Sequence, residues 1–122
     1  MENKIHVMKH VLELSQTMGE ALEHIKAQVN EGQEANTIEL ANDTMSAFAS
    51  IIQSMGTFLG DLPKNKIEEY TNILLKSFDV LATTYEQQQG VKTLEVLQFN
   101  VLPAYKKWKE ELENQLQRYV VS

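Results

Sequence analysis

Two histidines near the N-terminus have a spacing that could support metal chemistry. His6 and His10 lie four positions apart, with Glu2 and Glu13 near the same side of a helix drawn through them. Residues four apart lie one turn above each other, so two imidazoles could reach one metal ion. The chain has no HExxH or ExxH motif to supply the remaining ligands. Because both histidines fall on the polar side of the predicted helix, we expect a solvated surface and keep a metal-binding or enzymatic bundle as an alternative.

The other reactive residue types do not form a recognisable catalytic set. The chain has no cysteine, which excludes disulfides, thiol nucleophiles and cysteine metal sites. Ser15 lies in an apolar row with no histidine predicted nearby, and we expect its hydroxyl to bond to a carbonyl one turn back in its own helix. No glycine-rich phosphate-binding motif occurs. We therefore predict no catalytic residue and no cofactor.

Length and charge narrow the function classes. The 122 residues suffice for one domain over 1–122, and no apolar run approaches the 18 residues of a membrane span. The first 30 residues carry charge or histidine every few positions, so we expect no signal peptide and a cytoplasmic protein. Residues 1–62 hold nine acids and three lysines, whereas residues 63–122 hold eight acids and eight bases. This balance disfavours nucleic acid and anionic membranes as partners.

Apolar residues at alternating spacings of three and four predict the helices, because such a row is a seam along one side of a helix. We expect helices over residues 3–30, 36–58, 65–87 and 93–120. In the second helix this row places Ile52 in the core, as Leu22 is placed in the first. The three clearest rows are Met8, Val11, Ser15, Met18, Leu22, Ile25 and Val29; Ile38, Ala41, Met45, Phe48, Ile52, Met55 and Leu59; and Ile67, Thr71, Leu74, Phe78, Leu81 and Tyr85.

The fourth helix is interrupted in sequence by Pro103, which lacks a backbone donor and clashes with the preceding turn. A strand over residues 93–101 is the competing interpretation, but a lone strand has no pairing partner. The predicted fold is an all-α, single-domain, antiparallel four-helix bundle, with the fourth helix kinked or divided near Pro103.

The second half of the chain carries more apolar side chains than one four-helix core needs. In a soluble protein, surplus apolar surface commonly marks contact with another chain. The alternative is that a kink at Pro103 and the loops bury these side chains within the same chain. A kink at Pro103 would open a groove beside the third helix, where a partner helix or a second copy could dock. The candidate partner-binding residues are Ile73, Leu75, Val80, Val96, Phe99 and Leu102.

We therefore expect a non-enzymatic protein-binding bundle that acts as an adaptor, chaperone or regulator. In layout, acidic balance and length the chain is similar in outline to small bacterial export chaperones such as the flagellin chaperone family. That resemblance implies a protein partner in the bacterial cytosol. The alternatives are the metal-binding or enzymatic bundle that uses His6 and His10, and a structural homo-oligomer.

Overall fold

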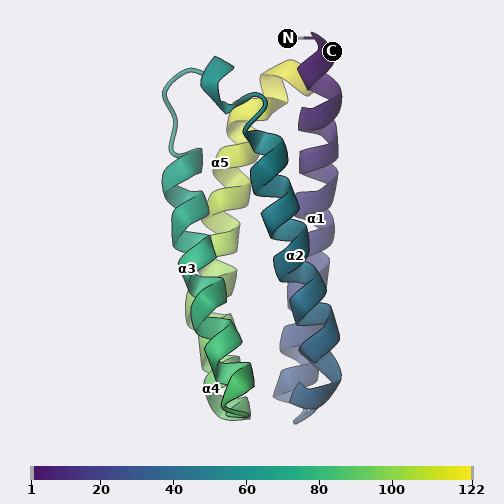
Figure 1. The fold of residues 1–122 in the computed structure, drawn as a ribbon, viewed down its shortest axis with the longest axis vertical. Coiled ribbons are helices and arrows are strands. Elements are labelled where there is room, and N and C mark those ends of the chain that lie inside the picture. Colours follow the sequence, from purple (N-terminus) through teal and green to yellow (C-terminus); the bar gives the residue numbers. More distant parts are fainter. Residues whose placement is uncertain (1, 122) are drawn as a thin grey trace.

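Four helical rods run up and down beside one another, with both ends of the chain at the same end of the molecule (Figure 1). The computed structural model describes residues 2–121, and their side chains from residue 4 onward. The first three rods are α1 (Glu2–Asn30), α2 (Ile38–Met55) and α3 (Ile67–Glu86). The fourth joins α4 (Gly90–Val96), a π-helical segment (Leu97–Val101) and α5 (Leu102–Val120). Residues 2–121 contain no strand, and the predicted all-α four-helix bundle is confirmed.

The helix ends agree with the predicted ones to within a few residues. A 3₁₀ turn (Glu34–Thr37) precedes α2, so that helix begins at Ile38 and not at residue 36. After α1, Gly32 adopts a left-handed φ of 80°, and the Gln33 N–H donates to Gln28 O at 2.9 Å. These two features terminate the helix in the usual glycine-dependent way. After α3, Gln88 takes the equivalent left-handed conformation, and α4 starts at Gly90, three residues earlier than predicted.

The core rows of α1 and α3 are the predicted ones. Every member of the α1 row is buried, including Ser15. In α3, the row from Ile67 to Leu81 is buried and Tyr85 is half-buried. These rows supply two walls of the core.

The core row of α2 matches the predicted one at three of its seven positions and is shifted by one residue at the other four. Ile51 is fully buried, whereas Ile52 is only half-buried and Ile38 is exposed. The observed row includes Thr37 and Thr44, whose hydroxyls donate to Glu34 O and Leu40 O at 2.7 and 2.8 Å. A threonine whose hydroxyl bonds to a nearby backbone carbonyl can be buried without an unpaired hydroxyl. The predicted core row left these two threonines out because they are polar, and that prediction was wrong.

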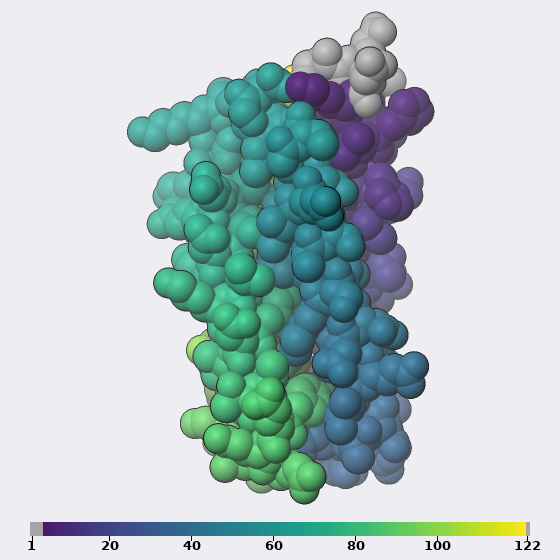
Figure 2. Space-filling view, in the orientation of Figure 1, coloured from purple at the N-terminus to yellow at the C-terminus, as the bar shows by residue number. Residues whose placement is uncertain are grey.

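Large aromatic side chains fill the centre of the bundle. Phe48 of α2 contacts Phe78 of α3 and Trp108 of α5, with ring centroids 5.4 and 5.3 Å apart. The Trp108 indole N–H donates to Thr71 Oγ1 of α3 at 3.0 Å. Figure 2 shows side chains of α2 and α3 covering the seam between these helices on the front face. The aromatic cluster therefore links three of the four rods.

The π-helical segment changes which residues of the fourth rod face the core. A π turn holds one residue more than an α turn, so it shifts the buried row that precedes it. Val96, predicted to point outward and to bind a partner, is buried at 4% exposure together with Thr93. Leu102, the other incorrect candidate, is also buried at 4% exposure, as part of the hydrophobic core. Both residues belong to the core.

Candidate functional site: a groove between α3 and α5

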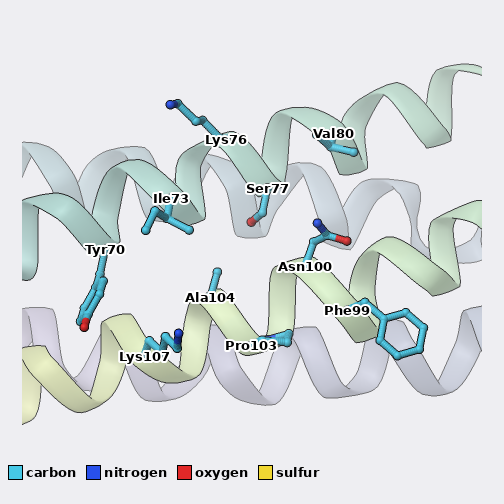
Figure 3. Close-up of a pocket in the computed structure, with 10 residues that line it drawn as sticks. All are labelled: Tyr70, Ile73, Lys76, Ser77, Val80, Phe99, Asn100, Pro103, Ala104 and Lys107. Carbon is cyan, nitrogen blue, oxygen red and sulfur yellow. The ribbon is translucent and has the colours of Figure 1, made fainter.

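A groove of about 400 Å³ lies between α3 and the stretch that runs from the π-helical segment into α5 (Figure 3). Tyr70 and Lys107 lie at one end, and Val80 and Phe99 lie at the other. The full lining is Tyr70, Ile73, Lys76, Ser77, Val80, Phe99, Asn100, Pro103, Ala104 and Lys107. No acidic residue is among these ten. The groove is therefore mainly apolar, with two lysines.

Small side chains make the groove concave. Ser77 of α3 and Ala104 of α5 are both buried, and Figure 3 shows them reaching toward each other from the two walls. The Ser77 hydroxyl donates to Leu74 O at 2.7 Å, so the groove floor presents no unpaired hydroxyl. Larger residues stand around this floor: Ile73 is 49% exposed, Val80 is 48% exposed and Phe99 is 73% exposed.

The α3 wall carries a second row with helix-packing spacing. Tyr70, Ile73, Ser77 and Val80 follow one another at spacings of three, four and three, and all four line the groove. The first row of α3 already packs into the bundle core. A second row with the same spacing is typical of a helix that packs against two neighbours. Here α5 covers only part of this second row.

The other wall owes its shape to the π-helical segment and Pro103. The Leu102 N–H donates to Leu97 O, five residues back, and not to Gln98 O. Pro103 has no N–H to offer Gln98 O in its place. Leu97 and Val101 of the π-helical segment are buried, and Phe99 between them is exposed. The local interruption that the sequence predicted near Pro103 therefore lies in the wall of the groove, next to Phe99.

The structure brings together three of the six predicted contact residues, Ile73, Val80 and Phe99. Leu75 is exposed but does not line the groove, and Val96 and Leu102 lie in the core. Sequence reasoning missed the groove floor, Tyr70 as a groove residue and the two lysines. The spacing from Tyr70 to Val80 was a readable signal for the α3 wall, whereas the contribution of α5 depends on the π turn.

The histidines lie on a different surface. His6, His10 and Glu13 are all exposed on α1, as expected, and the Glu2 side chain lies outside the described part of the chain. Among the described residues, no group of three or more His, Asp or Glu side chains is placed to hold a metal ion. The two histidines therefore have no third ligand among the described residues.

We expect the double variant His6→Ala/His10→Ala to change the free energy of unfolding by less than about 0.5 kcal/mol, as for exposed positions without partners. Chemical denaturation of the two proteins measures this difference. Tight stoichiometric zinc in protein purified without added metal, lost in the double variant, would instead establish a metal site at these histidines.

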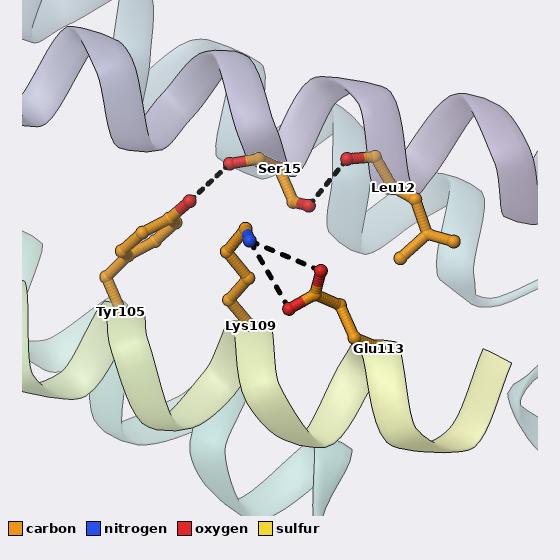
Figure 4. A network of polar contacts seen from close by, with 5 residues as sticks. All are labelled: Leu12, Ser15, Tyr105, Lys109 and Glu113. Carbon is orange, nitrogen blue, oxygen red and sulfur yellow. Dashed lines mark hydrogen bonds and ion pairs between the residues drawn. The ribbon is translucent and has the colours of Figure 1, made fainter. Parts of the chain in front are cut away.

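Ser15 forms the hydrogen bond predicted for it. Its hydroxyl donates to Leu12 O at 2.7 Å, and its carbonyl accepts from the Tyr105 hydroxyl at 2.5 Å (Figure 4). Burial, reinforced by the nearby Glu113 carboxylate, raises the pKa of Tyr105 to about 12. Glu113 accepts from Lys109 at 3.3 Å. The network joins α1 to α5 and places no base on the Ser15 hydroxyl, so its geometry is that of a structural contact and not of an activated nucleophile.

The comparisons with known proteins place the chain in a family. A family model described as "Domain of unknown function (DUF8042)" matches residues 6–111. No curated protein and no solved structure matches the chain. Within the described residues, none of the helices has the length and apolar character needed to cross a membrane. Since the matched region covers most of the 122 residues, the chain belongs to the family described as Domain of unknown function (DUF8042).

Proposed function

We propose that this protein is a non-enzymatic helical bundle that binds another protein, as an adaptor, chaperone or regulator. The observation that carries the proposal is the groove between α3 and α5, where Ile73, Val80 and Phe99 are exposed around a floor of small residues. Exposing these side chains to water has a free-energy cost that covering them would recover. Clustered exposed apolar residues commonly mark contact sites, whereas isolated ones do not.

The remaining exposed large apolar residues of the described part of the chain are scattered and do not line this groove. They are Ile38, Leu75, Val91 and Val121. Val91 is 78% exposed at the start of α4 and is a matched control for Phe99, because it is apolar, exposed and outside the groove. Comparing the two positions separates the effect of the groove from the general effect of adding surface charge.

We expect Phe99→Glu to keep the fold and abolish binding. The ring is 73% exposed, so the free energy of unfolding should change by less than about 0.5 kcal/mol. A charge introduced at the apolar centre of a contact commonly weakens binding by more than about tenfold. Thermal melting and capture of partners from source cells, performed in parallel with Val91→Glu, measure both quantities.

Each other outcome has a definite meaning. If Phe99→Glu unfolds the protein, Phe99 is a core residue and the proposed contact surface is wrong. If both variants retain the same partners as the original chain, the groove does not bind them. If light scattering shows that the chain is a dimer and that Phe99→Glu dissociates it, the groove serves self-association, and the structural homo-oligomer replaces a distinct partner.

A further inference from the structure

We infer that the occupant of the groove is an amphipathic helix of another protein, about three turns long, with acidic residues flanking its apolar face. This inference rests on the proposed function and specifies its partner. It draws on the spacing of the α3 wall, the charge of the groove and the distribution of exposed apolar residues over the rest of the chain.

The spacing of the α3 wall favours a helix. Tyr70, Ile73, Ser77 and Val80 repeat at three, four and three, which is the pattern that meets the side chains of an adjacent helix. The small floor residues Ser77 and Ala104 allow a helix to approach closely. Tyr70 and Val80 are ten residues apart, or about 15 Å along α3, which matches about three turns of a partner.

The charge of the groove favours acidic flanks. Lys76 lies on the α3 side of the groove and Lys107 on the α5 side, and Figure 3 shows the Lys76 side chain extending away from α5, at the outer edge of the α3 wall. Neither lysine forms an ion pair with another described residue. Glu110 and Glu111 lie beyond the Tyr70 end, and Glu111 accepts from the Lys66 backbone N–H at 2.7 Å. The two charged side chains that line the groove are therefore both cations, and acidic residues adjoin only its Tyr70 end among the residues that these two surfaces share.

The net charge of −6 does not reverse this preference at physiological salt. Screening reduces interactions beyond about 8 Å at that ionic strength, so the acids on α1 and α2 act weakly across the bundle. The two lysines border the groove itself and act at short range. An acidic flank on the partner would pair with them, whereas a basic flank would be repelled.

A second copy of the chain fits the groove less well. Among the residues whose side chains are described, the exposed apolar ones outside the groove are scattered, so this part of a copy offers no second apolar row. A dimer would therefore join groove to groove through a two-fold contact, which uses the same patch on both subunits. That arrangement brings the lysines of two grooves together without an acid among the lining residues. Like charges disfavour it.

Two synthetic helical peptides test the inference. Both are 15 residues long with the same leucine row, and they differ only in having Glu or Lys at the positions that flank the row. We expect the acidic peptide to bind at least tenfold tighter than the basic one in 50 mM NaCl, measured by fluorescence anisotropy. In 500 mM NaCl the difference should fall below threefold, because salt screens exposed ion pairs.

Variants locate the binding site and its charge preference. Lys76→Glu/Lys107→Glu should reverse the preference between the peptides, while Lys9→Glu/Lys26→Glu, an equal change in net charge on α1, should leave it in place. Phe99→Glu should weaken both peptides at least tenfold. Equal binding of the two peptides, or a preference that the Lys76 and Lys107 substitutions leave unchanged, would overturn the charge inference.

The failures of this inference and of the proposed function are distinguishable. If neither peptide binds but Phe99→Glu still abolishes a native partner, the groove binds protein and the helical occupant is wrong. If the chain forms a dimer that Phe99→Glu dissociates, the occupant is a second copy. If the peptides bind and Phe99→Glu has no effect on them or on native partners, both the inference and the proposed function fail.

Discussion

Ile51→Asp is expected to lower the free energy of unfolding by about 3–5 kcal/mol, whereas Ile52→Asp lowers it by about 1 kcal/mol. Ile51 is fully buried, so an aspartate there places an unpaired charge in an apolar core. Ile52 is half-buried, and from that position a carboxylate can reach water. The two variants change the same residue type at adjacent positions, so each is the matched control for the other.

Urea denaturation followed by circular dichroism measures the difference. A larger loss for Ile52→Asp than for Ile51→Asp would show that α2 packs with the row that its apolar residues alone suggest. Equal losses would contradict the one-residue shift that buries Thr37 and Thr44.

Trp108→Ala is expected to cost about 3–5 kcal/mol, the range for removing a large buried aromatic side chain. Trp108 is fully buried and meets Phe48 edge-on, and its indole N–H bonds to Thr71 on α3. The substitution leaves a cavity between α3 and α5. It also removes the hydrogen bond between these two helices, which form the walls of the groove. Trp108 is the only tryptophan, so the variant has no tryptophan fluorescence to follow. Denaturation followed by circular dichroism therefore measures the loss of stability.

The contribution of the hydrogen bond between Trp108 and Thr71 can be measured separately from that of the volume of the Trp108 side chain. Thr71→Val keeps the shape of the side chain but leaves the Trp108 N–H unpaired, at an expected cost of about 1–3 kcal/mol. In the double variant Trp108→Phe/Thr71→Val, the donor is gone as well. We therefore expect the double variant to lose less stability than the sum of the losses measured for Trp108→Phe alone and Thr71→Val alone. Full additivity would contradict the bond as a contributor to stability.

The sequence predicted the helices and the core rows well where the buried positions are almost all apolar. In α1 the predicted row is the observed one, and the single polar member, Ser15, forms its expected hydrogen bond. In α2 the prediction is confirmed at Ala41, Phe48 and Met55 and was wrong by one residue at the other four positions, two of which hold Thr37 and Thr44. Local hydrogen bonds allow these two threonines to occupy core positions that hydrophobicity alone assigns to their apolar neighbours.

The candidate site was predictable in part. Exposed apolar residues on α3 follow from the width of its apolar arc, and an outward Phe99 follows from the apolar face of the fourth helix, which does not include it. The π turn adds a residue that apolar periodicity does not reveal, and this extra residue moves Val96 inside. Leu102 is buried at the start of α5, a helix that packs on α1 as well as on α3. The position of such a shift depends on tertiary packing, which the spacing of one segment does not contain.

The central claim is that the groove beside Phe99 contacts another protein, and site-specific photocrosslinking tests it most directly. A benzophenone amino acid replaces Phe99 in one protein and Val91 in a second, and both are irradiated in lysate of the source cells. We predict a discrete adduct with a different polypeptide from position 99 and not from position 91. Excess original protein should suppress that adduct, and excess Phe99→Glu should not. Equal adducts from both positions, no adduct from position 99, or an adduct containing only a second copy of the chain would contradict the claim.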